Sequence, residues 1–235
     1  MPPRRGRPST VERRPSASAT PRPVTAPQPE NVQMSRQRTP TLEVRDALLR
    51  AARELLDERG PEALAIRDIA TRASVAPMGV YNRFGSKDGI LNALLQQGFA
   101  ELAAAVTVTP DGDHPLRSIA TGCANYRAFA LANPAMYRLM FDFPVPGLYS
   151  SDAARAAAHI AFDRLVDAVR LGIATRHIQA GEPYEIAQRI LAACHGAVSL
   201  ELRNIGFVSD HTTHYTALVG TVLRGIATYP ETSSG

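Results

Sequence analysis

The chain has 235 residues, of which 45% are hydrophobic, and it carries a formal net charge of +4 with only two cysteines. This length allows one or two modest hydrophobic cores, while the apolar runs are too short for a membrane-spanning helix and the N-terminus lacks the apolar stretch of a secretory signal. Two cysteines far apart argue against a disulfide framework and a cysteine-based zinc site. We therefore expect a globular, cytoplasmic protein without a membrane partner, a metal or a cofactor.

Residues 1–39 are predicted to form a disordered arm, because they are rich in Pro, Ser, Thr and Arg and poor in large apolar side chains. Residues 1–38 hold eight arginines against two glutamates, so this segment carries +6 and the remainder −2. The segment Pro3–Pro8 resembles an AT-hook core, whose arginines enter an A·T minor groove, and a nonspecific basic tail is the alternative interpretation. A third hypothesis is that translation starts at Met34, which would remove residues 1–33.

Apolar residues recur every three or four positions beyond the arm, which predicts a helix over residues 41–59. Two short helices follow, over 66–73 and from Pro77 onward, separated by a tight turn. Ser86 is placed to cap a longer helix over 87–106. A helix, a tight turn and a second short helix are the elements of a helix-turn-helix.

The second half of the chain is also predicted to be helical, since Val and Ile do not alternate with polar residues as they would in strands. The expected fold class is all-α. A three-helix unit, within a domain over 41–101, is joined by the fourth helix to a C-terminal helical domain over 115–229. The helices predicted in that second domain are 116–132, 134–141, 152–177, 183–205 and 210–229.

Residues at fixed spacing in the first domain form a specific motif. They are Leu49–Ala52, Leu55, Leu56, Gly60, Ile66–Ala70, Ala73, Val75 and Val80–Lys87. The segment 48–91 that contains them resembles the DNA-binding domain of the tetracycline-repressor (TetR) family. Small and apolar residues here would set the two short helices at a steep angle, so that the outer face of the second can enter a major groove.

The resemblance implies DNA contacts for three positions around this motif. Arg67 is expected to touch a base edge or a phosphate, Tyr81 to bond a phosphate through its hydroxyl, and Lys87 to hold a phosphate at a helix N-terminus. The alternative interpretation for Arg67 is a surface ion pair with Glu62 or Asp68. For Tyr81 the alternative is a ring that packs inside the helix-turn-helix, and the two roles are compatible.

The second short helix is expected to carry the remaining DNA contacts. Asn82 and Arg83 are candidates for contacts to adenine and guanine, respectively, unless they reach only phosphates. The residues expected to face outwards from this helix are Pro77, Met78, Gly79, Asn82 and Arg83.

Two C-terminal segments, Asn133–Phe141 and Cys194–Leu202, resemble less specifically the TetR subgroup with a Trp-His-Gly signature in its regulatory domain. The chain has no tryptophan, so the first residue of that signature is missing. The resemblance implies a four-helix dimer interface and a ligand cavity beneath the connection to the first domain.

An apolar pocket for a ligand is expected among the aromatic and methionine side chains of this domain, although ordinary core packing is the alternative for each. Phe143 belongs to the same cluster. A histidine among the candidates is more simply explained by hydrogen bonds to backbone carbonyls than by a ligand. The candidates are Tyr126, Phe129, Met136, Tyr137, Met140, Phe141, Phe162 and His195.

The resemblance implies a sequence-specific transcriptional regulator that binds a palindromic operator in double-stranded DNA as a homodimer and is found with the bacterial nucleoid when bound. We expect a repressor that an unidentified small-molecule effector releases, with a ligand-independent or activating regulator as the alternative. Catalysis is not expected, because Cys194 and His195 are adjacent on a helix and point about 100° apart. No catalytic or metal-binding residue is predicted elsewhere.

Overall fold

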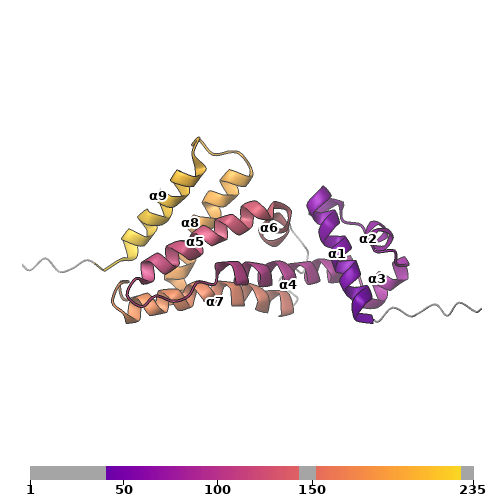
Figure 1. Cartoon of the computed structure of the whole chain (residues 1–235), viewed down its shortest axis with the longest axis horizontal. Helices are drawn as coiled ribbons and strands as arrows, with labels where there is room; N and C mark the ends of the chain where they lie inside the picture. The colour runs from indigo at the N-terminus through magenta and orange to yellow at the C-terminus, as the bar shows by residue number, and fades with distance from the viewer. Residues whose placement is uncertain (1–40, 143–151, 229–235) are drawn as a thin grey trace, which may run out of the picture. The chain divides into compact units, whose positions relative to one another are not determined.

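The structure, a computed structural model, describes residues 41–142 and 152–228, and the predicted arm with its hook-like segment and Met34 lies outside these ranges. Within them the regular elements are helices, as expected for the all-α class, and the strand-like pairing is one isolated bridge between Ile178 and Ala227. The elements are α1 (Thr41–Arg59), the 3-10 helix η1 (Pro61–Ala63), α2 (Ile66–Arg72), α3 (Pro77–Phe84), α4 (Lys87–Val106), α5 (Pro115–Ala132), α6 (Pro134–Phe141), α7 (Asp152–Ala174), α8 (Pro183–Leu202) and α9 (His211–Ile226) (Figure 1).

Three C-terminal helices are shorter than predicted. α7 stops at Ala174 since Arg176 adopts a left-handed φ of 59° and the following residues turn back toward α9. There Gln179 N–H donates to the Ile226 carbonyl over 2.9 Å, which also ends α9 in an extended segment. α8 ends through local contacts instead: Asn204 adopts a left-handed φ of 52°, and Ile205 N–H donates to the Leu200 carbonyl over 3.2 Å.

The first three helices enclose a small core, in which the side chains of Leu48, Leu56, Ile69 and Val80 are fully buried. The turn between α2 and α3 closes through Ser74, whose φ of 55° is left-handed. This core fixes the angle between α2 and α3 and leaves one face of α3 at the surface.

α4 is shared by the two halves of the described chain. It contacts α1 and α3 on one side and α5, α6 and α7 on the other (Figure 1). Its N-terminus is capped by Ser86, whose Oγ accepts a hydrogen bond from Gly89 N over 3.2 Å. The same helix therefore positions the helix-turn-helix and forms part of the C-terminal bundle.

Gly89 allows the end of α3 to lie directly against the first turn of α4. A Cβ at this position would collide with the carbonyl oxygen of Phe84, and a backbone atom cannot move aside as a side chain can. We expect Gly89→Ala to lower the free energy of unfolding by about 2 kcal/mol or more, as in an overpacked core. Urea unfolding measures this change.

A matched control for that substitution is Gly225→Ala in α9, where an added Cβ meets no atom within 4 Å. In a helix this exchange is expected to leave stability unchanged or raise it by up to about 1 kcal/mol. Equal unfolding midpoints for the two variants would show that the α3–α4 junction tolerates a side chain.

Candidate functional site

One face of α3 is open to solvent. Pro77, Met78, Tyr81 and Asn82 are all exposed, with exposed fractions of 64% for Met78 and 48% for Tyr81. Their spacing places them on one side of the helix. With almost half of its surface exposed, the Tyr81 ring is not packed inside the helix-turn-helix. α3 thus presents four of the predicted contact residues together.

Arg67 is exposed on α2 and has no ion-pair partner within residues 41–142 and 152–228. The alternative interpretation of a surface pair is wrong, because both proposed partners are taken. Glu62 pairs with Arg138 at 2.7 Å, and Asp68 pairs with Arg59 at 3.4 Å. The Arg67 guanidinium is therefore available to an external anion.

Two residues of α3 do not face outwards as expected. Gly79 points at the turn between α2 and α3, because a Cβ there would collide with Cγ1 of Val75. Arg83 lies along its own helix: its Nη1 donates to the Gly79 carbonyl over 3.3 Å, and its Nε is buried without a hydrogen-bond partner among the described residues. To contact DNA, Arg83 must first extend away from α3.

Lys87 is the first residue of α4 and is half-buried at the junction with α3. A cation at this end of a helix opposes the helix dipole. The free amide groups of the first turn and the Lys87 ammonium together suit a phosphate group. Arg67, Tyr81 and Lys87 come from three successive helices.

Arg53 connects the first three helices to the rest of the chain, a role that sequence analysis missed. Its guanidinium donates to Glu101 of α4 over 2.9 Å and to Asn133, between α5 and α6, over 2.7 Å. It also pairs with Asp57 of its own helix at 3.1 Å. No sequence signal distinguishes Arg53 from the neighbouring exposed Arg50, because its partners lie far along the chain.

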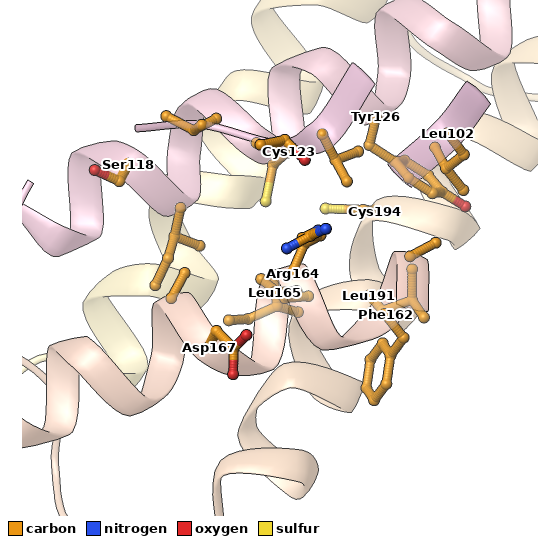
Figure 2. Close-up of a pocket in the computed structure, with 18 of the residues that line it drawn as sticks. Leu102, Ser118, Cys123, Tyr126, Phe162, Arg164, Leu165, Asp167, Leu191 and Cys194 are labelled. Atoms are coloured by element: carbon orange, nitrogen blue, oxygen red, sulfur yellow. The ribbon is translucent and has the colours of Figure 1, made fainter. Parts of the chain in front are cut away.

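A cavity of about 760 Å³ lies between α4, α5, α7 and α8. Its walls are mostly apolar, and three of the predicted ligand contacts, Tyr126, Phe141 and Phe162, line it. Figure 2 shows Tyr126 and Phe162 on different helices around the space. Its size falls within the usual range for small-molecule sites.

The other five predicted ligand contacts do not line this cavity. Phe129 is buried on α5, and Met136 and Met140 of α6 pack against Gly98 of α4, where a Cβ would lie 2.6 Å from the Met136 sulfur. These three belong to the core, which was the alternative interpretation. The remaining two, Tyr137 and His195, belong to the hydrogen-bonded group described next, and Phe143 lies outside the described residues.

Tyr126, Tyr137, His195 and Ser199 form a hydrogen-bonded group beside the cavity. The Tyr126 and Tyr137 hydroxyls are 2.9 Å apart, Tyr137 Oη is 2.6 Å from His195 Nδ1, and Ser199 Oγ is 3.4 Å from Nε2. The expectation that backbone carbonyls satisfy His195 is wrong, since hydroxyls do so. A neutral ring protonated at Nε2 satisfies all these contacts, and burial lowers the pKa of His195.

We expect acidification to destabilise the fold through His195. Because its pKa is lowered in the folded state, the unfolded chain binds more protons as the pH falls below the ordinary value of 6.5. The contribution of neutral His195 to the free energy of unfolding is complete above pH 6.5 and is lost as the pH falls through the folded-state pKa of this residue. The free energy of unfolding, measured by urea titration at several pH values, should fall more steeply for the wild type than for His195→Gln.

His159 provides the control for this measurement, because it is exposed on α7. His159→Gln should keep the wild-type pH dependence. Identical slopes for the wild type and His195→Gln would contradict the prediction.

Several cavity-lining residues were not predicted from sequence. Cys123 and Cys194 lie in its wall, and Arg164 and Asp167 of α7 also reach it (Figure 2). Arg164 and Asp167 were missed because the candidates were restricted to aromatic and methionine side chains and one histidine. Within the described ranges no group of three or more His, Cys, Asp or Glu could hold a metal ion. No helix there has the length and apolar character needed to cross a membrane.

α3 is the second helix of a helix-turn-helix and exposes one face to solvent. α4 joins this unit to a helical domain that contains a cavity. These features define the class of helix-turn-helix proteins with a separate C-terminal domain. Comparison with known proteins specifies the family. Residues 48–94 match the model for bacterial regulatory proteins of the tetR family, and residues 119–222 match the tetracyclin repressor-like C-terminal domain. The chain belongs to the tetR family.

Among curated relatives, the HTH-type transcriptional regulator Rv1816 of Mycobacterium tuberculosis is 31% identical over 134 residues, which cover 54% of this chain and 56% of the relative. The chain thus matches just over half the length of that relative. The HTH-type transcriptional repressor Rv3405c of the same organism is 49% identical over 53 residues, 23% of this chain and 28% of the relative. A solved structure from Rhodococcus sp. RHA1, described as a protein of unknown function, superposes with a TM-score of 0.70 at 26% identity, covering 79% of this chain and 95% of that one.

Proposed function

We propose that this protein is a sequence-specific DNA-binding transcriptional regulator that acts as a repressor. The observation that carries the proposal is the exposed face of α3, with Tyr81 and Asn82 at the surface, and the exposed Arg67 on the preceding helix, which has no ion-pair partner in the part of the chain that the structure describes. Side chains of these types bond phosphates and base edges in a major groove. The similarity of residues 48–94 to tetR-family regulators and the name of the repressor Rv3405c support it.

The division of labour follows the two predicted domains. We assign DNA binding to residues 41–101 and effector binding and dimerisation to residues 115–229. The two family matches, 48–94 and 119–222, fall inside these ranges and support the division. Membership of the Trp-His-Gly subgroup stays a prediction.

The proposed effector is a small molecule with an apolar body that occupies the cavity. Phe99 and Leu102 of α4 form part of the wall, and the first turn of the same helix packs against the end of α3. An effector that displaces α4 would therefore shift the recognition helix and release the operator. The cavity and the shared helix support release by an effector over a ligand-independent or activating regulator.

The proposed active form is a homodimer on a palindromic operator. On the outer face of α8, Ala192, Gly196 and Leu200 form an exposed apolar strip, with 46% of Leu200 accessible, and α8 itself packs against α9. Two copies joined here would present two recognition helices to half-sites one helical turn apart. Sedimentation of the wild type against Leu200→Glu tests this arrangement, since the variant should sediment as a monomer.

We place the protein in the bacterial cytoplasm, at the nucleoid when it is bound to DNA, and assign it a binding role and no catalytic one. Its membership of a family of bacterial regulatory proteins supports both assignments.

Footprinting on the promoter next to its own gene tests the function, first without and then with candidate effectors. Protection of a palindrome that weakens when an effector binds is the expected result. Protection that persists with every small molecule that binds the purified protein would instead favour the ligand-independent regulator. Absence of a footprint at any promoter would contradict DNA binding itself.

Base-specific contacts are tested separately with Asn82→Ala and Arg83→Ala. Either substitution should reduce the preference for the operator over random DNA by about ten-fold if the side chain contacts a base, since such contacts contribute about 1–3 kcal/mol. Equal losses on operator and random DNA would show that these side chains reach only phosphates.

A further inference from the structure

The chain's only two cysteines, separated by 70 residues in the sequence, meet in the wall of the cavity. Cys123 lies on α5 and Cys194 on α8, and both are buried, with exposed fractions of 4% and 3%. Figure 2 shows the two sulfur atoms directed toward one another at the edge of the space. Neither thiol has a part in the proposed DNA binding.

We propose that Cys123 and Cys194 form an oxidisable dithiol site that hydroperoxides convert to a disulfide between α5 and α8. The cavity gives a small oxidant access to thiols that are otherwise covered. Because its walls are mostly apolar, it favours organic hydroperoxides with an apolar body.

The two thiols are not equivalent. Interaction with the Cys123 thiol lowers the pKa of Cys194, while interaction with Cys194 and burial raise the pKa of Cys123. A thiolate is the nucleophile in thiol oxidation, so these directions favour Cys194 as the attacking group and Cys123 as the resolving group, an assignment that the single substitutions below test.

The reaction balances in two steps. The Cys194 thiolate attacks the distal oxygen of a hydroperoxide ROOH, the O–O bond breaks, and RO⁻ takes up a proton to leave as the alcohol ROH. The Cys123 sulfur then attacks the Cys194 sulfenic acid, forming the S–S bond and releasing water. Overall two thiols lose two hydrogens, and one hydroperoxide is reduced to an alcohol and water.

The disulfide would join two walls of the proposed effector site. Tyr215 of α9 already fixes α5 at this point, since its hydroxyl donates to the Cys123 carbonyl over 2.7 Å. A bond from the Cys123 sulfur to α8 would therefore alter the cavity directly. Formation of the bond stands apart from the proposed function, whereas any effect on effector binding rests on it.

The test treats the reduced full chain with cumene hydroperoxide or hydrogen peroxide and follows intact mass and free thiols after denaturation. The expected product is a monomeric chain lighter by two hydrogens, without free thiols, that yields a cross-linked Cys123–Cys194 peptide and is restored by dithiothreitol. Two free thiols after treatment, or disulfides only between chains, would overturn the proposal. The measurement needs no DNA, so its failure is distinct from a failure of DNA binding.

Single substitutions assign the roles of the two thiols. In Cys123→Ser, Cys194 should stop at the sulfenic acid, which dimedone traps, whereas in Cys194→Ser the remaining thiol should react roughly ten-fold more slowly than Cys194 does. Trapping Cys123 as readily as Cys194 would overturn the assignment. Circular dichroism melting shows whether each variant is folded, and the alanine variants replace any serine variant that is not.

Access through the cavity is tested with Ala158→Phe, which places a ring on the α7 wall. This variant should slow oxidation by cumene hydroperoxide more than oxidation by hydrogen peroxide. An equal effect on both reagents would overturn the cavity as the route to the thiols.

Discussion

Lys87→Ala is expected to weaken binding to operator and random DNA alike, by about three- to ten-fold near physiological salt, and to reduce the dependence of log K on log salt by about 0.9. Lys87 lies at the first turn of α4 beside free backbone amides, where a DNA phosphate would be held by both. It makes no ion pair within the described residues, so its removal leaves no carboxylate unpaired. Fluorescence anisotropy over a salt series measures both quantities.

The control for this substitution is Arg117→Ala, which removes the same charge from an exposed position on α5. A larger change in DNA affinity and salt dependence for Lys87→Ala than for Arg117→Ala would indicate a local phosphate contact, because both substitutions change the net charge equally. If Arg117→Ala flattens the salt dependence as much as Lys87→Ala, the phosphate contact at α4 is refuted.

Arg53→Ala is expected to have the largest effect away from the DNA-facing surface. The substitution removes donors from Glu101 and Asn133, and hydrogen bonds to charged groups contribute about 1.5–3 kcal/mol each where they are shielded from water. Because Arg53 is largely covered while Glu101 is partly exposed, we expect a loss of about 1–3 kcal/mol in total. Urea unfolding should show this loss.

Operator affinity should fall as well, although Arg53 is not one of the residues on the proposed DNA-binding face. Its contacts hold α1 against α4 and the α5–α6 corner, so without them the helix-turn-helix loses part of its support. Arg53→Lys should recover only part of the effect, because an ammonium cannot bond several partners as a guanidinium does. Arg50→Ala, on the same helix, should leave stability within about 0.5 kcal/mol of the wild type. Equal results for Arg50→Ala and Arg53→Ala would contradict the proposed link.

The helix-turn-helix was predictable because its signals are local. Apolar spacing, Pro77 at a helix start and Ser86 at a cap act over a few residues, and α3 and α4 begin where they were expected. The end of α7 was predicted too late, because the pairing of Ile178 with Ala227 depends on a segment 49 positions further along the chain.

The candidate ligand site was predicted less well, since residue type does not show which way a side chain points. Met136 and Met140 were included as large apolar groups. Because Gly98 has no side chain, however, α6 lies so close to α4 that both methionines belong to the core. Cys123 was not among the candidate ligand contacts, although it lies in the cavity wall. Whether such a residue lies in the core or in the cavity wall depends on how helices distant in sequence pack against one another.

The length of α4, which has 20 residues, amplifies a small rotation at one of its ends into a larger displacement at the other. At 1.5 Å per residue the helix is about 30 Å long, so a tilt of about 5° around its cavity end would move its first turn by roughly 3 Å. That displacement equals the length of a hydrogen bond, and in a symmetric pair it would occur twice, once in each subunit. An effector would therefore need only a slight wedge between α4 and the opposite wall to take both recognition helices out of register with the DNA.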